Sequence, residues 1–379
     1  MAFLNRTPSG EGSSAPPASP EPPARAGSSA ASGAPPASSP SPLTPSSIVG
    51  RLRRNAFLPI WPATALLFAV SPLLASGSLS GSAILGMLPF AAVLALAAVG
   101  QTLVVQQRGL DLAVPGTMSL AAVIVTAHAA GNDDRLVPAL GLVLLASMTA
   151  GLVSGVAVTW FGITPLVATL GVNALLLGMI QQITGGLSTK TAPANLSTFT
   201  LDKTAGVPNT VILVGAIVLA VTFLIRKTTI GRRFVAVGAN APAARAAGIP
   251  VRSYQLATYV VASVCYGAAG VLLAGFLQTS SISVGADYLL PTVAAVVLGG
   301  TSLLGGSGSV VATAIGALFL TQLQQVVLGT GAASSVQFIV QGVVIALAVA
   351  LRQVPARLRA WKGGRRARWP TTAGEPARG

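Results

Sequence analysis

The chain contains little charge, and acidic residues are especially scarce. Only 8% of its 379 residues are charged and Asp and Glu together number 8, whereas hydrophobic residues make up 52%. Because a soluble domain is about one-quarter charged, this composition excludes an ordinary soluble fold and indicates an integral membrane protein. The formal net charge of +15 does not indicate a nucleic-acid partner, because the basic residues lie in loops and tails, where membrane proteins carry their topology signal.

Cysteine and histidine occur once each, as Cys265 and His128. A single cysteine excludes an intrachain disulfide and a thiolate metal cluster, and its apolar surroundings predict a small buried side chain. His128 lies near the end of an apolar run, and we interpret it as a packed or interfacial residue rather than a proton relay. With so few acids as well, the sequence offers no acid–base pair for catalysis, so we expect neither an enzyme nor a cofactor.

Long hydrophobic runs, in contrast, are abundant. Ten runs of roughly 17–25 residues are each long enough to cross about 30 Å of hydrocarbon as a helix. They are placed at residues 57–76, 82–105, 112–130, 136–158, 165–186, 208–225, 254–277, 288–304, 309–328 and 334–351. The predicted fold class is therefore all-α, a polytopic membrane protein in which Gly and Pro break several helices.

The distribution of charge predicts the orientation of these helices. If the N-terminus is cytoplasmic, all but three of the 23 basic residues fall on the inner side; the exceptions are Arg135, Lys190 and Lys203. Such an asymmetry places both termini in the cytoplasm, which requires an even number of helices. The expected organisation is a disordered Pro-, Ala- and Ser-rich tail at residues 1–50, a transmembrane domain at 51–353 and a basic tail at 354–379.

The break between the second and third predicted helices contains Asp111, one of the few acids close to hydrocarbon depth. An ionisable group there is costly unless it faces protein or water, and Pro115 and Gly116, just after it, interrupt the next helix. Asp111 either lines a transport path or stabilises the start of the following helix and pairs with Arg108. We favour the structural role.

The longest predicted inner loop, residues 226–253, has basic ends that suit the membrane surface. Its middle predicts one short exposed helix, because Asn240 is a good N-cap, residues 243–247 (AARAA) are helix formers and Gly248 supplies a stop. A helix of about two turns does not persist alone. We therefore expect another protein to receive it.

The glycine-rich residues 299–309 have no Lys close enough to complete a phosphate-binding loop, so the energy for transport must come from a partner or a gradient. We interpret the glycines instead as positions where a helix breaks or backbones approach closely. The residues that we assign to helix breaks or close packing, here and in the break after the second predicted helix, are Gly109, Pro115, Gly299, Gly300, Gly305 and Gly306.

Six segments of the chain carry a resemblance to a known family. They are residues 109–114 (GLDLAV), 164–171 (TPLVATLG), 183–186 (ITGG), 231–240 (GRRFVAVGAN), 243–249 (AARAAGI) and 296–309 (VVLGGTSLLGGSGS). In this order they resemble the permease subunit of ribose-type ABC importers over residues 57–352. The resemblance implies a permease for a small sugar in the inner membrane, paired with a second permease copy or homologue.

The same resemblance implies cytoplasmic ABC ATPase subunits and an extracytoplasmic solute-binding protein as partners. It also implies a segment that enters a groove on the ATPase, made of Gly238, Asn240, Ala243, Ala244, Arg245 and Gly248. Two departures weaken the match: Ala241 and Pro242 stand where relatives often carry acids, and Pro115 stands where they have Gly. Pro115 removes a backbone donor and fixes φ, so we expect a stiffer break.

Uncharged polar residues in the apolar runs suit a sugar better than an ion, because amides offer hydroxyls both donors and acceptors. These residues are Gln101, Asn173, Gln181, Gln182, Gln278, Gln322, Gln324 and Gln325. As candidates for the translocation path we select Asp111, Gln101, Asn173 and Gln278. An ABC permease for nucleosides or branched-chain amino acids remains an alternative, as does an ion-coupled transporter, although Asp111 and His128 are nearly the only groups that could bind its driving ion.

Overall fold

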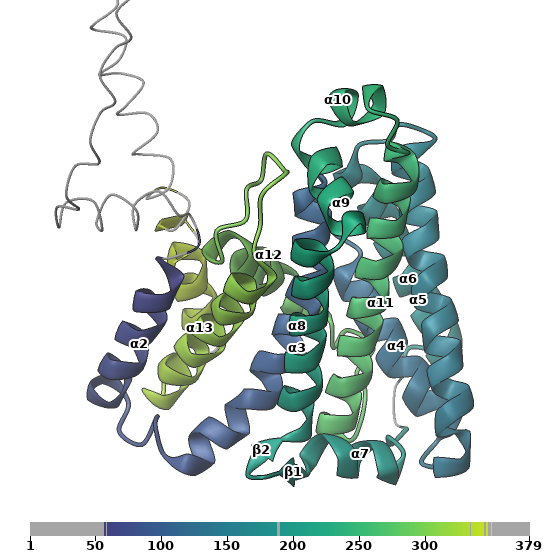
Figure 1. Ribbon diagram of the computed structural model, residues 1–379. Coiled ribbons are helices and arrows are strands. Elements are labelled where there is room, and N and C mark those ends of the chain that lie inside the picture. Colours follow the sequence, from purple (N-terminus) through teal and green to yellow (C-terminus); the bar gives the residue numbers. More distant parts are fainter. Residues whose placement is uncertain are drawn as a thin grey trace, which may run out of the picture. The chain divides into compact units, whose positions relative to one another are not determined.

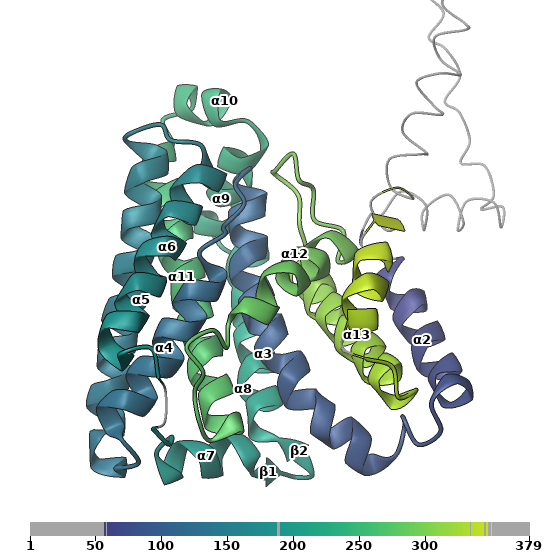
Figure 2. The ribbon, with the colours of Figure 1, turned by 180° about the vertical axis from the view of Figure 1, so that it is seen from behind.

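The computed structural model is mostly helical (Figures 1 and 2). It describes residues 57, 59–187, 190–333, 335–344, 346, 347 and 350. The tails predicted at residues 1–50 and 354–379 lie outside the described residues.

The described elements follow one another along the chain with short connections. The helices are α2 (Ile60–Leu74), α3 (Gly81–Gln106), α4 (Val114–Ala129), α5 (Leu136–Thr159), α6 (Pro165–Thr184), α7 (Ala194–Leu201), α8 (Asn209–Lys227), α9 (Thr229–Ala239), α10 (Ala241–Ala246), α11 (Val251–Leu277), α12 (Leu289–Leu298) and α13 (Val310–Gly329). A further helix, Ser335–Val344, follows α13. Two 3-10 turns, η1 (Asp133–Arg135) and η2 (Ala286–Tyr288), precede α5 and α12, and β1 (Lys203–Thr204) pairs antiparallel with β2 (Val207–Pro208).

Six helices are long and apolar enough to cross a membrane, namely α3, α5 with η1, α6, α8, α11 and α13. A largely helical membrane protein was therefore predicted correctly. The other four predicted helices are present but shorter: α2, α4, η2 with α12, and Ser335–Val344. The predicted helix 288–304 is too long, since α12 ends at Leu298. Gly300 has a φ of +89°, which a right-handed helix does not adopt.

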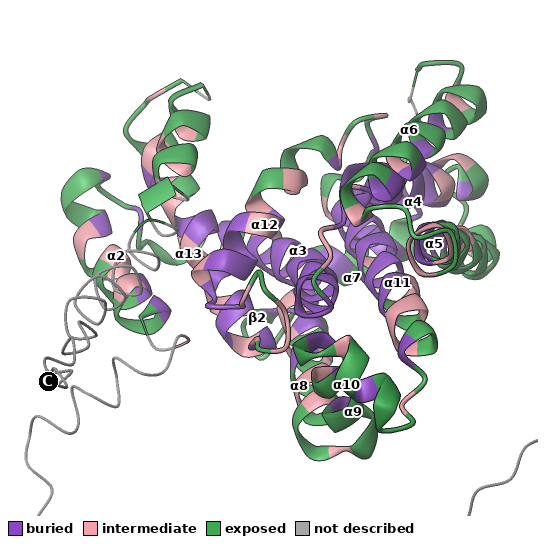
Figure 3. Cartoon of the chain, turned by 90° about the horizontal axis from the view of Figure 1, so that it is seen from above, coloured by how far each residue is buried: buried purple, intermediate pink, exposed green. Residues whose placement is uncertain are grey.

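The core is built on α3 and α11, which pack against each other and against α5, α4 and α13. Buried residues gather on these central helices (Figure 3). Small residues make the close packing possible: a Cβ added at Gly270 of α11 would strike the Met118 carbonyl of α4, and one at Gly151 of α5 would strike the Tyr259 carbonyl of α11. Cys265 is buried within α11, as predicted.

The outer surfaces of the peripheral helices are apolar. Leu145 of α5, Leu170 of α6 and Leu219 of α8 are 63%, 56% and 66% exposed. A soluble protein rarely exposes so many large apolar side chains together. These surfaces therefore suit contact with lipid.

The helices have two distinct ends, which we call the α10 end and the α7 end (Figure 1). At the α7 end, α7 and the β1–β2 ribbon fill a stretch for which the sequence predicted only a loop. Backbone contacts connect this stretch to its neighbours: the amide of Ala192 donates to the Gln278 carbonyl at 3.0 Å, and that of Asn195 donates to Asp133 Oδ1 at 2.8 Å. His128 is exposed in the last turn of α4, at the same end.

Candidate coupling segment and translocation path

The short helix α10 forms where the sequence predicts it. Asn240 Oδ1 accepts from the Ala243 amide at 3.1 Å, which satisfies one of the donors left open at a helix start. At the other end Gly248 has a φ of +76°, and the amides of Gly248 and Ile249 each donate to carbonyls of the last turn at 3.0 Å. These two bonds close the helix in the arrangement typical of a glycine stop.

Ala244 attaches α10 to the rest of the protein. It is the only buried residue of the helix, and it packs between Val237 of α9 and Val251 of α11. Ala243 and Arg245 on either side are exposed. The helix therefore presents most of its surface outward while one methyl group fixes its position.

The preceding helix, α9, was not predicted from the sequence. Thr228 caps its start by accepting from the Gly231 amide at 3.1 Å. Phe234 and Val237 face the core, while Arg232 and Arg233 are exposed. This amphipathic pattern lies within the basic stretch that we had assigned to the membrane surface. Helices α9 and α10 form one unit at the α10 end.

A junction connects this unit to the break after α3. Arg108 Nε donates to the Gly238 carbonyl at 2.9 Å, and its Nη2 donates to the Ala239 carbonyl. Gln107 Nε2 donates to the Phe234 carbonyl at 2.8 Å. Carbonyls in the last turn of a helix have no intrahelical partner and carry partial negative charge, so a guanidinium group is well suited to bind them.

The glycine-rich loop between α12 and α13 completes the junction. The Gly306 amide donates to the Gln106 carbonyl at 2.9 Å. A Cβ added at Gly238 would collide with that same carbonyl, and one at Gly305 would collide with the Arg108 side chain. The sequence-predicted residues Gly238, Gly305 and Gly306 thus come together at a point where three chain segments touch.

Asp111 is fully buried directly after this junction. Its Oδ1 accepts from the Ala113 amide at 2.9 Å, one residue before α4 begins, and its Oδ2 has no partner among the described residues. The predicted pairing with Arg108 is wrong, because the guanidinium group is bound by the carbonyls of α9. The carboxylate instead supports the turn that starts α4.

Gln101 holds the backbone of the break. With its amide oriented to satisfy both ends, the nitrogen donates to the Asp111 carbonyl at 3.2 Å and the oxygen accepts from the Asp111 amide at 3.3 Å. The Tyr266 hydroxyl of α11 lies 3.0 Å from the same side chain. A buried backbone outside regular structure needs such partners, because an unpaired polar group costs free energy at membrane depth.

Helix α6 satisfies the next two amides of the break. Asn173 Oδ1 accepts from the Gly116 amide and Thr169 Oγ1 accepts from the Leu112 amide, both at 2.8 Å. Pro115 lies in the first turn of α4. An N–H at that position would have no intrahelical acceptor, so the helix loses no hydrogen bond through the proline. Gln278 is separate from these residues, exposed beyond the last residue of α11 at the α7 end.

The remaining predicted break residues lie beside packed neighbours. A Cβ at Gly109 would strike the Tyr259 hydroxyl, and one at Gly299 would strike the Thr313 backbone of α13. Gly299 and Gly300 mark the end of α12. The structure therefore has two interrupted segments, after α3 and after α12, that meet at the same junction.

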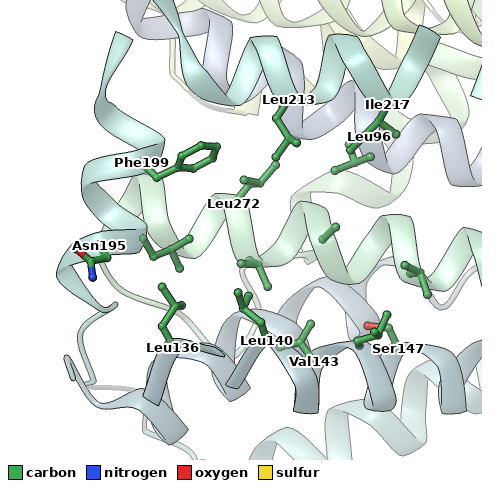
Figure 4. Close-up of a pocket in the computed structure, with 15 residues that line it drawn as sticks. Leu96, Leu136, Leu140, Val143, Ser147, Asn195, Phe199, Leu213, Ile217 and Leu272 are labelled. Atoms are coloured by element: carbon green, nitrogen blue, oxygen red, sulfur yellow. The ribbon is translucent and has the colours of Figure 1, made fainter. Parts of the chain in front are cut away.

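Two cavities lie nearer to the α7 end than to the α10 end. One of 370 Å³ is lined almost entirely by apolar side chains of α3, α5, α7, α8 and α11, including Leu96, Leu140, Phe199, Leu213 and Leu272 (Figure 4). Its lining offers little to a polar solute. The second cavity, of 730 Å³, lies among α3, α11, η2, α12, α13 and the helix Ser335–Val344, and its lining contains several amide side chains. Neither cavity is lined by any of the four predicted path residues.

The small exposed helix α10 follows α9, and the last carbonyls of α9 bind Arg108 beside the buried interrupted segment. Among helices long and apolar enough to cross a membrane, this arrangement indicates the permease subunit of a transport system rather than a simple anchor. Comparison with known proteins agrees: residues 83–349 match the family described as branched-chain amino acid transport system permease component. The chain belongs to this family and is a multi-pass membrane protein.

Named relatives in this comparison are import permeases. The ribose import permease protein RbsC of Escherichia coli (strain K12) is 35% identical over 259 residues, which cover 67% of this chain and 80% of the relative. The autoinducer 2 import system permease protein LsrC of Photorhabdus luminescens is 34% identical over 233 residues, covering 62% and 70%. No solved structure was found to match the chain.

Proposed function

We propose that this chain is the permease subunit of an ATP-driven importer for a small sugar, in the inner membrane. Its ten helices cross the bilayer, both termini lie in the cytoplasm, and the α10 end faces the ATPase. A second permease copy or homologue completes the path, and an extracytoplasmic binding protein delivers the solute. The two named relatives, which import ribose and autoinducer 2, support a sugar as the cargo.

The observation that carries this proposal is the connection from α10 to Asp111. Helix α10 is mostly exposed, is held by Ala244, and continues from α9, whose last carbonyls bind Arg108. Asp111 follows three residues later, buried. A displacement imposed on α10 by a partner would therefore be transmitted through hydrogen bonds to the interrupted segment. Gly238, Asn240, Ala243, Ala244, Arg245 and Gly248 form the proposed coupling segment.

Enlarging the exposed surface of α10 should detach the ATPase without unfolding the permease. In Ala243→Trp the bulky ring projects from an exposed position, so the helix and its caps persist. We expect the ATPase recovered with the tagged permease to fall about tenfold, the effect of about 1.4 kcal/mol of lost binding. The matched control is Thr204→Trp in the β1–β2 ribbon, which should recover the ATPase normally. Unchanged recovery and uptake in Ala243→Trp would contradict the proposed docking.

Thiol labelling tests the orientation. In a Cys265→Ala background, Arg245→Cys in α10 and Lys203→Cys in β1 each place a thiol at an exposed position. We expect a membrane-impermeant maleimide added to intact cells to label only the Lys203→Cys variant. The same reagent added to inverted vesicles should label only the Arg245→Cys variant, because the basic loops remain cytoplasmic. Labelling of the Arg245→Cys variant in intact cells would overturn the whole arrangement.

One observation favours a second candidate, an ion-coupled transporter. Asp111 is a buried acid with one oxygen that has no partner among the described residues, and coupling ions bind such groups at helix breaks. Sugar uptake that collapses with an uncoupler while ATP is held constant would support that candidate. Uptake that persists would support the ATP-driven importer.

A further inference from the structure

The 730 Å³ cavity at the α7 end is lined by both amide and aromatic side chains. Its volume lies within the range of small-molecule sites, about 300–1,000 Å³. The side chains of Gln324, Gln337 and Gln341 contribute to its wall. Gln337 and Gln341 are four residues apart on one helix, which places them on the same face. Amide groups are thus gathered around a space large enough for a monosaccharide.

These three amides have no hydrogen-bond partner in the part of the chain that the structure describes. The neighbouring Gln325 differs, because its Nε2 donates to the Ser78 carbonyl at 2.8 Å and connects α13 to the start of α3. A side-chain amide offers two donors and one acceptor oxygen. Gln324 is exposed and Gln337 and Gln341 are half-buried, so their amide groups are open to a ligand. Several such groups around one cavity match the alternating donors and acceptors of sugar hydroxyls.

Aromatic rings complete the wall. Phe90, Tyr288 and Phe338 line the same cavity, and Phe90 is fixed edge-on against Phe276 with ring centroids 4.9 Å apart. The face of an aromatic ring carries partial negative charge and attracts the slightly positive C–H groups of a sugar ring. Flat apolar surfaces beside amides therefore suit a molecule with a C–H face and a rim of hydroxyls.

The charge of the lining residues favours a sugar over an amino acid as the ligand of this cavity. Asp287 is the only charged side chain among the described lining residues, and none is basic. An amino acid would bring a carboxylate that needs a cation or several directed N–H groups, since burying an unpaired charge is unfavourable. A neutral sugar ring needs no such charged or directed partners.

We propose that this cavity is the first binding site for the sugar after the binding protein releases it. Gln324 stands exposed at its mouth, Gln337 and Gln341 bind hydroxyls, and the aromatic rings stack on the ring face. This inference rests on the proposed function, because the α7 end must face outward. It also moves the solute away from the path residues selected from the sequence.

The test is protection of a thiol at the mouth. In the Cys265→Ala background, Gln324→Cys is labelled in right-side-out vesicles with a hydrophilic thiol reagent, with and without D-ribose. The matched control is Thr330→Cys, at an exposed position at the end of α13 that does not line the cavity. At D-ribose about ten times its Kd, labelling of the Gln324→Cys variant should slow about tenfold, because the unoccupied fraction falls as 1/(1 + [L]/Kd).

Labelling of the Thr330→Cys variant should be unaffected by D-ribose, and L-leucine should protect neither variant. Adding Gln341→Leu to Gln324→Cys should raise the D-ribose needed for protection about tenfold, through loss of a hydrogen bond from a half-buried side chain. Vesicles that accumulate D-ribose without protection of the thiol at position 324 would overturn the assigned site while leaving the importer intact. Protection by L-leucine alone, or a thiol at position 324 that never reacts, would also overturn it. Vesicles that accumulate no sugar of a pentose and hexose panel would instead contradict the proposed function.

Discussion

Replacing Arg108 with Ala is expected to lower sugar uptake per ATP hydrolysed by about tenfold, equivalent to about 1.4 kcal/mol. The substitution removes both guanidinium bonds to the carbonyls of Gly238 and Ala239. A hydrogen bond with a charged group contributes about 1.5–3 kcal/mol to stability. Because Arg108 is exposed, water can bind the freed carbonyls in the variant, and the expected effect is smaller. Uptake and ATP hydrolysis are measured in the same proteoliposomes.

The ratio of the two rates distinguishes coupling from stability. A purely structural role would lower the melting temperature and both rates together, leaving their ratio unchanged. Arg108→Lys keeps the charge but cannot reproduce a two-nitrogen contact, so its ratio should lie between those of the parent and the Ala variant. An unchanged ratio in Arg108→Ala would remove this residue from the proposed coupling path.

Asp111→Leu is expected to reduce both the amount of folded permease and its uptake strongly. The leucine leaves the Ala113 amide without its acceptor inside a fully buried site, and an unpaired buried donor costs about 1–3 kcal/mol. The start of α4 then loses the turn that places it. Folded protein is measured by size-exclusion chromatography in detergent, and uptake in vesicles.

Asp111→Asn is the matched control. An asparagine oxygen still accepts from the Ala113 amide, so the structural role assigned to Asp111 predicts nearly normal folding and uptake. If Asp111 instead carries a coupling ion, the neutral amide should abolish uptake as completely as leucine while the protein remains folded. The pair of variants therefore decides between the ATP-driven importer and the ion-coupled alternative.

Local signals in the sequence predicted α10 well. Asn240 and Gly248 act within a few residues of the helix they bound, so their capping geometry follows from residue type. Six of the ten predicted segments are helices of membrane-crossing length and the other four are shorter apolar helices. The six were predicted correctly because hydrophobic length is a property of each run by itself. Gly299 and Gly300, where α12 ends, were predicted to interrupt a helix. The predicted helix nevertheless extended past them, from residue 288 to residue 304.

Contacts between distant segments could not be predicted in this way. Arg108 and Gly238 are 130 residues apart, and nothing local indicates that they meet. The nearest charged neighbour, Asp111, suggested the wrong partner. The large cavity joins α3, α13 and the helix Ser335–Val344. The two amides proposed to bind the sugar, Gln337 and Gln341, were therefore not selected from the sequence, whereas Gln324 at the mouth had been noted among the polar residues that suit a sugar.

The single alanine that fixes α10 has a consequence for how such proteins diversify. Because Ala244 alone is enclosed while the other residues of the helix are not, the outward face can change without disturbing the permease beneath. If α10 docks on the ATPase as proposed, exchanging a few exposed positions would pair the chain with a different ATPase subunit. Under that proposal, the choice of partner and the choice of cargo would depend on separate residues at the α10 end and the α7 end.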